Sequence, residues 1–214
     1  MYVEISPRQS GKTTRLVDAV VSFLQNNFSD DLRIVICSIN LYSIKHIKRL
    51  VRNKIANDLS NVLPMDYSKE SILRTVDSLY MNKIISMTSR TNLRDHNEPS
   101  YWFFDEFAYL PPNKILHPIH GNILENAYYC TTPPTGDERT INMLVNHCQN
   151  NNFDIHHINP WAEHNILEQG GLDEYTREVV LGDWVRYMES KNLIKGLKEN
   201  LIRKEIRKHR FKNW

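Results

Sequence analysis

Between residues 2 and 158 the sequence alternates short apolar runs, rich in β-branched and aromatic residues, with longer amphipathic runs. Short apolar runs are typical of strands buried on both faces, and amphipathic runs are typical of helices that cover such strands. Strands alternating with helices favour a parallel sheet, because each helix returns the chain to the same end of the sheet. The sequence therefore predicts an α/β domain with a mainly parallel sheet flanked by helices.

The individual elements follow from the same periodicity. We expect strands at residues 2–6, 32–37, 83–88, 101–104, 126–131 and 153–158. We expect helices at residues 13–25, 42–58, 71–80 and 141–149, where apolar side chains recur every three or four positions. Beyond these the pattern is helical only, and the pair Gly170-Gly171 is the one indicated boundary. We therefore divide the chain into residues 1–171 and a helical, basic segment at residues 172–214.

The composition excludes several classes of protein. The 214 residues include 27 Lys or Arg, 25 Asp or Glu and 41% hydrophobic residues, which is typical of a globular chain and not of a disordered one. No run approaches the roughly 18 consecutive apolar residues of a membrane span. The three cysteines include no CxxC pair, so we expect reduced thiols rather than disulfides or a metal knot. The N-terminus lacks a secretory pattern, and we expect the protein to work inside a cell.

The charge is distributed unevenly along the chain. Residues 191–214 contain nine Lys or Arg and two Glu, a net charge of +7, whereas residues 1–190 carry −5. A basic tail on a mildly acidic body is typical of proteins that contact a polyanion such as nucleic acid. The candidate DNA contacts are Arg203, Lys204, Arg207 and Lys208. The alternative is a Lys-rich helix that only keeps the protein in solution.

The strongest local motif is SPRQSGKTT, residues 6–14, which lies between a predicted strand and a predicted helix. It nearly matches the phosphate-binding pattern G-x-x-x-x-G-K-[ST], with Ser6 in place of the first glycine. Gly11 would allow backbone N–H groups to approach a phosphate, Lys12 would bridge the β- and γ-phosphates, and Thr13 would bind Mg²⁺. The candidate nucleotide-binding residues are Ser6, Pro7, Gln9, Ser10, Gly11, Lys12, Thr13 and Thr14. A surface loop with a chance Gly-Lys-Thr is the alternative, which the strand–loop–helix setting disfavours.

Two further motifs follow predicted strands. Asp105 and Glu106 end an apolar run, at the sheet edge where ligands of α/β proteins collect. Asp105 would hold Mg²⁺ and Glu106 would polarise the attacking water, although an acidic pair can also be a solvated turn. Thr131, Thr132 and Pro133 follow the next strand, and their hydroxyls could sense the γ-phosphate and couple its loss to a neighbouring element. A proline turn with threonines at a strand end is the alternative for this motif.

In their order and in their residues, these motifs resemble those of the ATPase domain of the large terminase subunit, the viral DNA-packaging motor. The phosphate loop of that family reads like PRQxGKT, matched at residues 7–13, and its acidic segment reads like DExAFxP, matched by DEFAYLP at residues 105–111. A TTP motif follows, as at residues 131–133. The segment at residues 93–106 resembles the family's loop rich in Arg and Gly, with Asp95 in place of a glycine. The resemblance spans roughly residues 2–190.

The resemblance implies a RecA-like P-loop ATPase core of the ASCE type that binds ATP and Mg²⁺ and translocates double-stranded DNA into a capsid. It implies that Arg8 is a catalytic arginine and that Arg94 or Arg139 could reach a neighbouring subunit. The implied partners are the portal or capsid vertex and a small terminase or separate nuclease subunit. We expect a monomer in solution, a ring on assembly, and a location in the host cytoplasm with transient attachment to the procapsid.

The sequence departs from the family pattern at both ends. Only residues 1–5 precede the phosphate loop, where family members carry a segment that contacts adenine, so base selectivity stays open. About 80 residues follow the TTP motif, too few for the family's nuclease domain, and we expect no DNA cleavage.

Three other functions compete with this interpretation. A helicase would need a second RecA-like domain, for which 214 residues leave no room. A nucleotide kinase has no need for the adjacent pair Asp105 and Glu106. A non-catalytic DNA or capsid adaptor would keep the fold without turnover, and the intact Lys12 and Thr13 argue against it.

Overall fold

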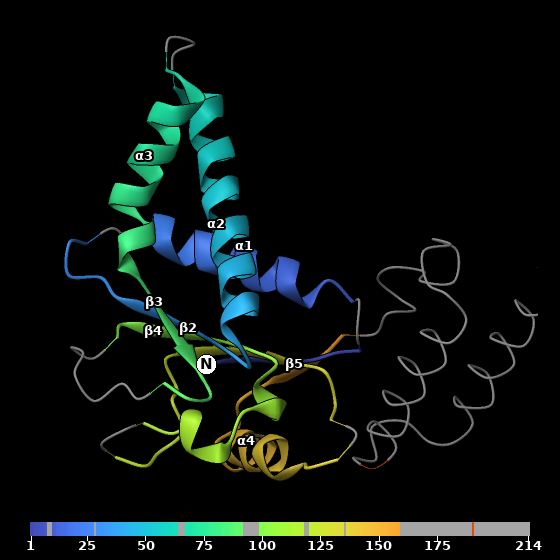
Figure 1. Cartoon of the computed structure of the whole chain (residues 1–214). Helices are drawn as coiled ribbons and strands as arrows, with labels where there is room; N and C mark the ends of the chain where they lie inside the picture. The colour runs from blue at the N-terminus through green and yellow to red at the C-terminus, as the bar shows by residue number, and fades with distance from the viewer. Residues whose placement is uncertain are drawn as a thin grey trace, which may run out of the picture.

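The computed structural model describes residues 1–7, 10–27, 29–63, 67–91, 99–117, 120–134, 136–158 and Ser190. Its centre is a six-stranded sheet with the strand order β3-β2-β4-β5-β1-β6, and every pair of neighbouring strands is parallel (Figure 1). The strands are β1 (Tyr2–Ile5), β2 (Ile34–Ser38), β3 (Ile84–Thr88), β4 (Tyr101–Asp105), β5 (Ala127–Thr131) and β6 (Ile155–His157). The α/β class and the parallel sheet predicted from the alternating pattern are thereby confirmed.

Helices cover both faces of the sheet. One face carries α1 (Lys12–Asn26), α2 (Leu41–Val62) and α3 (Lys69–Leu79), and the other carries α4 (Arg139–Asn150) with two short 3₁₀ turns, η2 (Phe107–Tyr109) and η3 (Pro112–Lys114) (Figure 1). A third 3₁₀ turn, η1 (Met81–Lys83), leads into β3. Because successive strand residues point to opposite faces, Phe103 and Tyr128 pack against the α1–α3 layer, whereas Phe104 and Tyr129 pack toward α4. The sheet is therefore the middle of three layers.

The helix ends follow local chemistry. Gly11 precedes α1 with φ at 82°, a left-handed conformation that glycine adopts without a steric penalty. Asn40 caps α2 by accepting a hydrogen bond from the Ser43 N–H at 2.9 Å, and Ser68 caps α3 in the same way. All ten elements predicted between residues 2 and 158 are present, with boundaries shifted by at most a few residues.

The largest boundary difference is at the end of α2, which continues to Val62 where the pattern predicted an end near residue 58. The last turns project beyond the sheet together with α3, so they bury little apolar surface and their helical periodicity fades (Figure 1). Leu59 and Leu63 still pack into the cluster formed with α3. Among the described residues no helix is long and apolar enough to cross a membrane. The predicted boundary near residue 171 and the segment at residues 172–214 lie outside the described residues.

Candidate functional site

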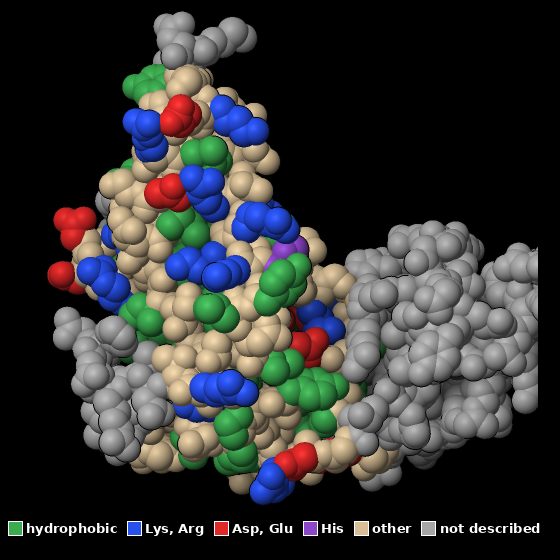
Figure 2. Space-filling model, in the orientation of Figure 1, with side chains coloured by type: hydrophobic (Ala, Val, Ile, Leu, Met, Phe, Trp, Pro, Cys, Tyr) green, Lys and Arg blue, Asp and Glu red, His purple; other side chains and the backbone are tan. Residues whose placement is uncertain are grey.

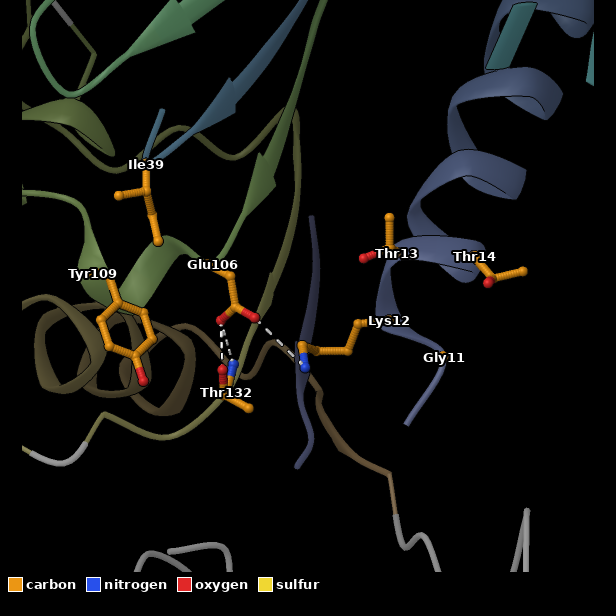
Figure 3. A pocket seen from close by; sticks show the side chains of 8 residues that line it. All are labelled: Gly11, Lys12, Thr13, Thr14, Ile39, Glu106, Tyr109 and Thr132. Atoms are coloured by element: carbon orange, nitrogen blue, oxygen red, sulfur yellow. Dashed lines mark hydrogen bonds and ion pairs between the residues drawn. The ribbon is translucent and has the colours of Figure 1, made fainter. Parts of the chain in front are cut away.

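The carboxyl ends of β1, β5 and β4 lie side by side, because these three strands are parallel neighbours in the sheet. The Ser6 N–H donates to the Thr131 carbonyl at 3.1 Å, which extends the β1–β5 pairing by one residue before the loop begins. The chain then passes through the loop to Gly11 and enters α1, whose N-terminus faces this edge of the sheet (Figure 3). Unsatisfied N–H groups at such a helix start attract anions.

A cavity of about 620 Å³ opens at this edge (Figure 3). It is lined by residues from the start of α1 and from the segments that follow β2, β4 and β5: Gly11, Lys12, Thr13, Thr14, Ile39, Glu106, Tyr109 and Thr132. Residues of all three sequence motifs therefore line one cavity, although they are up to 121 positions apart in the chain. Tyr109, from the DEFAYLP segment, and Ile39 also line it, and no motif had indicated Ile39.

Lys12 is the cation of the cavity. It is only 6% exposed, and its Nζ donates to the Pro7 carbonyl at 3.1 Å and lies 3.7 Å from Oε1 of Glu106. A buried ammonium retains its charge only when acceptors surround it, and here one carbonyl and one carboxylate do so. The side chain therefore presents a positive charge next to the anion-attracting start of α1.

Glu106 is held by the Thr131–Thr132 segment. Its Oε2 accepts hydrogen bonds from the Thr132 N–H at 2.8 Å and from the Thr132 hydroxyl at 2.6 Å, and it lies 3.3 Å from the Thr131 hydroxyl (Figure 3). The other oxygen faces Lys12. The backbone of Glu106 has φ at 53°, a left-handed conformation uncommon for a residue with a side chain. The structure thus joins the acidic pair to the threonine motif through direct hydrogen bonds.

Asp105, the last residue of β4, directly precedes Glu106 and is 8% exposed. Its Oδ2 accepts from the Ser38 hydroxyl at 3.0 Å, and the Cys130 thiol lies 3.9 Å from Oδ1. Burial and the adjacent charge of Glu106 raise the pKa of Asp105 to about 6, although Ser38, Lys12 and Cys130 oppose this. Without a cation, the carboxyl therefore takes up a proton more readily than an exposed aspartate.

A buried network of hydrogen bonds connects β1, α1 and the loop between them. Glu4, in the middle of β1, is fully buried and binds Arg15 of α1 through two hydrogen bonds of 2.7 and 3.0 Å. The same carboxylate accepts from the Ser6 hydroxyl at 2.8 Å and from the Tyr128 hydroxyl at 3.2 Å. Burial raises the pKa of Glu4, but the hydrogen bonds from Arg15 and Ser6 and the Arg15 charge outweigh it, and the pKa is lowered.

The network extends into the loop itself. Arg15 also donates to the Ser10 carbonyl at 2.7 Å, and the Ser10 hydroxyl donates to Ser6 at 2.9 Å. Ser6 and Ser10 thus support the loop from inside and do not line the cavity. Sequence reasoning missed Glu4 and Arg15; a charged residue inside an apolar strand was the available signal, because such a charge requires a buried partner.

The remaining predicted site residues lie beside the cavity, on the surface or outside the described residues. Thr131 and Pro133 adjoin the cavity wall, where the Thr131 hydroxyl accepts from the Ala108 N–H at 3.2 Å. Arg139 is exposed at the start of α4 and is paired with Asp137 of its own chain. Seven other candidates lie outside the described residues: Arg8, Gln9, Arg94, Arg203, Lys204, Arg207 and Lys208.

The oxygen donors of the site suit Mg²⁺. Thr13 lines the cavity, and Asp105 directly precedes the lining residue Glu106. Mg²⁺ is usually bound by one or two such oxygens together with water and substrate phosphates. In the described part of the chain, no group of three or more His, Cys, Asp or Glu could hold a metal ion by itself.

Comparison of the chain with protein-family models, curated proteins and solved structures finds no match. The functional argument consequently depends on the geometry of the cavity and on its chemistry.

Proposed function

We propose that the chain is an ATP-hydrolysing motor with a RecA-like P-loop core that moves double-stranded DNA into a viral capsid. The observation that carries the ATPase proposal is the convergence of Lys12, Glu106 and Thr132 on one cavity at the N-terminus of α1. The strand order supports the ASCE type, since β5 separates the loop strand β1 from the acidic strand β4. The assignment to DNA packaging depends on the resemblance of the three motifs to the large terminase subunit.

The residues have separate roles in this mechanism. The N–H groups at the start of α1 and the Lys12 ammonium bind the β- and γ-phosphates, for which Lys12 must exchange the Pro7 carbonyl for phosphate oxygens. Thr13 and Asp105 would hold Mg²⁺, which neutralises charge on the phosphates when bound. Glu106 accepts a proton from the water that attacks the γ-phosphorus as the bond to the β-phosphate oxygen breaks.

The contact between Glu106 and Thr132 supports a coupling role for the threonine motif. In this arrangement Oε2 is occupied by Thr132 and only Oε1 faces the cavity side of Lys12. A water placed by the γ-phosphate competes with Thr132 for Glu106, so nucleotide binding shifts the segment after β5. Arg8 is retained as the proposed catalytic arginine because of its place in the loop, and Arg94 and Arg139 are retained as proposed contacts to a neighbouring subunit.

The direct test is Mg²⁺-dependent ATP binding and hydrolysis by the purified chain and by Lys12→Ala. We expect the variant to lose ATP binding, because the phosphates lose their buried cationic partner. Lys54→Ala is the matched control, since Lys54 is half-exposed on α2 and paired with Asp18 on the surface. Unchanged ATP affinity in Lys12→Ala would remove the phosphate-loop assignment.

The motor part of the proposal has its own readout. Double-stranded DNA should stimulate ATP hydrolysis by the wild-type chain, because translocation links turnover to the bound polymer. A chain that hydrolyses ATP at the same rate with and without DNA would retain the ATPase assignment and contradict the motor assignment.

A further inference from the structure

Helix α2 has one apolar face and one basic face. Its buried side chains are Ile44, Ile47, Val51, Ile55 and Ala56, most of which lie along the side toward the sheet and α3. At 100° per residue, the opposite side of the helix carries Tyr42, Lys45, His46, Arg49 and Asn53. We call these five residues the outer face of α2. It contains no acidic residue, and Asp58, the one acidic residue of the helix, falls on the other side.

Three other cations of the projecting helix pair are paired with carboxylates. Arg52 makes two 2.6 Å hydrogen bonds to Asp77, Lys54 is paired with Asp18, and Arg74 is paired with Glu70 at 2.7 Å. A carboxylate partner offsets the positive electrostatic potential of each of these side chains at the surface. In Figure 2 the α2–α3 projection accordingly shows blue and red side chains together at several places.

Lys45 and Arg49 differ from these cations, because neither has a carboxylate partner among the described residues. Both are exposed, and Arg49 contacts Nδ1 of His46 at 3.1 Å. Tyr42, one turn nearer the sheet, is 82% exposed, an unusual position for an aromatic side chain. Two uncompensated positive charges and an exposed aromatic ring therefore follow one line along the helix.

We infer that the outer face of α2 binds the phosphate backbone of double-stranded DNA. Lys45 and Arg49 are one helical turn apart, about 6 Å, a spacing at which both can bind phosphates of one strand. Backbone contacts of this kind position a polymer without reading its sequence, as translocation requires. The inference deepens the proposed motor function and depends on it for the identity of the polymer.

The position of α2 relative to the cavity supports this inference. Ser38, the last residue of β2, donates to Asp105, and Ile39, the next residue, lines the cavity. Asn40 then caps α2, and the outer face begins at Tyr42. One hydrogen bond and the four residues 38–41 thus join the proposed Mg²⁺ carboxylate to the proposed DNA surface, so a change at Asp105 has a short path to the bound DNA.

The test measures DNA affinity against salt concentration for wild type and for Lys45→Gln/Arg49→Gln. We expect the variant to bind DNA more weakly, equally for two unrelated duplex sequences, with a slope of log affinity against log salt shallower by about two units. DNA stimulation of ATP hydrolysis should fall in parallel, and basal hydrolysis should not change. The matched control is Lys54→Gln/Arg74→Gln, which removes two carboxylate-paired charges from the same projection and should behave as wild type.

The outcomes separate this inference from the proposed function. A salt slope and DNA affinity equal to wild type in Lys45→Gln/Arg49→Gln would overturn the inference, as would an equal loss in the Lys54→Gln/Arg74→Gln control. A wild-type chain that hydrolyses ATP but binds no DNA would overturn the inference and leave the ATPase assignment intact. DNA binding that requires Lys45 and Arg49 in a chain without ATP hydrolysis would support the inference and overturn the ATPase assignment.

Discussion

Glu106 is the residue in which backbone geometry and site chemistry meet. A left-handed conformation costs a residue with a side chain on the order of 1 kcal/mol, so the surrounding structure must compensate for it. Here the compensation is the set of hydrogen bonds that Oε2 accepts from Thr132. The carboxylate is therefore oriented before any nucleotide binds, which reduces the reorganisation required for proton transfer.

Glu106→Gln should bind Mg-ATP and hydrolyse it at least about a hundredfold more slowly, because an amide cannot accept the proton of the attacking water. Single-turnover hydrolysis and a binding titration measure the two steps separately. Glu70→Gln, an exposed position on α3, is the control and should turn over normally. Near-normal turnover in Glu106→Gln would transfer the role of base to Asp105 or to a partner subunit.

Thr132→Val should reduce turnover while ATP affinity stays within a few-fold of wild type, because it removes the hydroxyl that donates to Glu106 at 2.6 Å without changing the side-chain volume much. Thr132→Ser keeps the hydroxyl and should retain most of the activity. Steady-state kinetics of the two variants make the comparison. Equal rates for Val and Ser would show that the hydroxyl has no part in orienting Glu106.

Asp105→Asn should stabilise the nucleotide-free protein at pH 7. Since the folded pKa of Asp105, about 6, lies above its unfolded value, the folded state binds more protons between about pH 4 and pH 6. The carboxyl therefore destabilises the fold as pH rises through that window, by up to about 3 kcal/mol. Urea unfolding at pH 5 and pH 7 should show a larger gain for the variant at pH 7; an equal gain at both values would contradict the raised pKa.

At the scale of elements, β1 and α1 are joined by more than apolar packing. Glu4 and Arg15 form a two-bond ion pair beneath the loop, and Ser10 ties the loop to the same arginine. Buried ion pairs contribute little net stability, but loss of one partner is expensive because the other charge remains desolvated. The network therefore holds the loop in place relative to both elements.

Arg15→Met should lower the free energy of unfolding by about 3 kcal/mol at pH 7, because it leaves the Glu4 carboxylate buried without its cation. The pKa of Glu4 is lowered in the wild type, so its favourable contribution is present above the unfolded pKa and is lost in acid. The deficit of the variant should consequently be smaller at pH 4 than at pH 7. Glu4→Gln/Arg15→Met should recover part of the loss, and failure to recover any would assign the effect to packing.

At the scale of the molecule, two separate sets of cations are available to a polyanion. One is the outer face of α2, and the other is the basic segment near the C-terminal end of the chain, which lies outside the described residues. Lys45 and Arg49 do not line the cavity, so we expect ATP binding to survive their neutralisation.

Neutralising Arg203, Lys204, Arg207 and Lys208 together should flatten the salt dependence of DNA binding by roughly one unit for each lost phosphate contact. Basal ATP hydrolysis should survive. Combined with Lys45→Gln/Arg49→Gln, the reductions in slope should add, because the two sets act on separate phosphates. A slope equal to wild type in the quadruple variant would indicate that the segment only keeps the protein in solution. A loss confined to ATP hydrolysis in the presence of the capsid would indicate that the segment docks on an acidic capsid surface.

Local sequence determined the type and approximate position of the α-helices and β-strands described between residues 2 and 158, but it did not predict the 3₁₀ turns η1, η2 and η3. The apolar run before Asp105 specifies a buried strand, and the apolar positions of α1, α2 and α4 repeat every three or four residues because each helix buries one side. The SPRQSGKTT motif and the acidic pair are equally local, since each is a run of adjacent residues. The proposal of a phosphate loop drawn from them needed no knowledge of the fold.

The tertiary structure alone decided which distant residues meet. Strand order placed β5 between β1 and β4 and so brought Thr132 to Glu106, and it brought Ser38 to Asp105 across 67 positions. It also enclosed Glu4 and paired Arg52, Lys54 and Arg74 with carboxylates, whereas Lys45 and Arg49 have none among the described residues. The physical reason is that the periodicity of apolar residues indicates which side of a segment is buried. It does not indicate what that side packs against, because the partner is a segment far away in the chain.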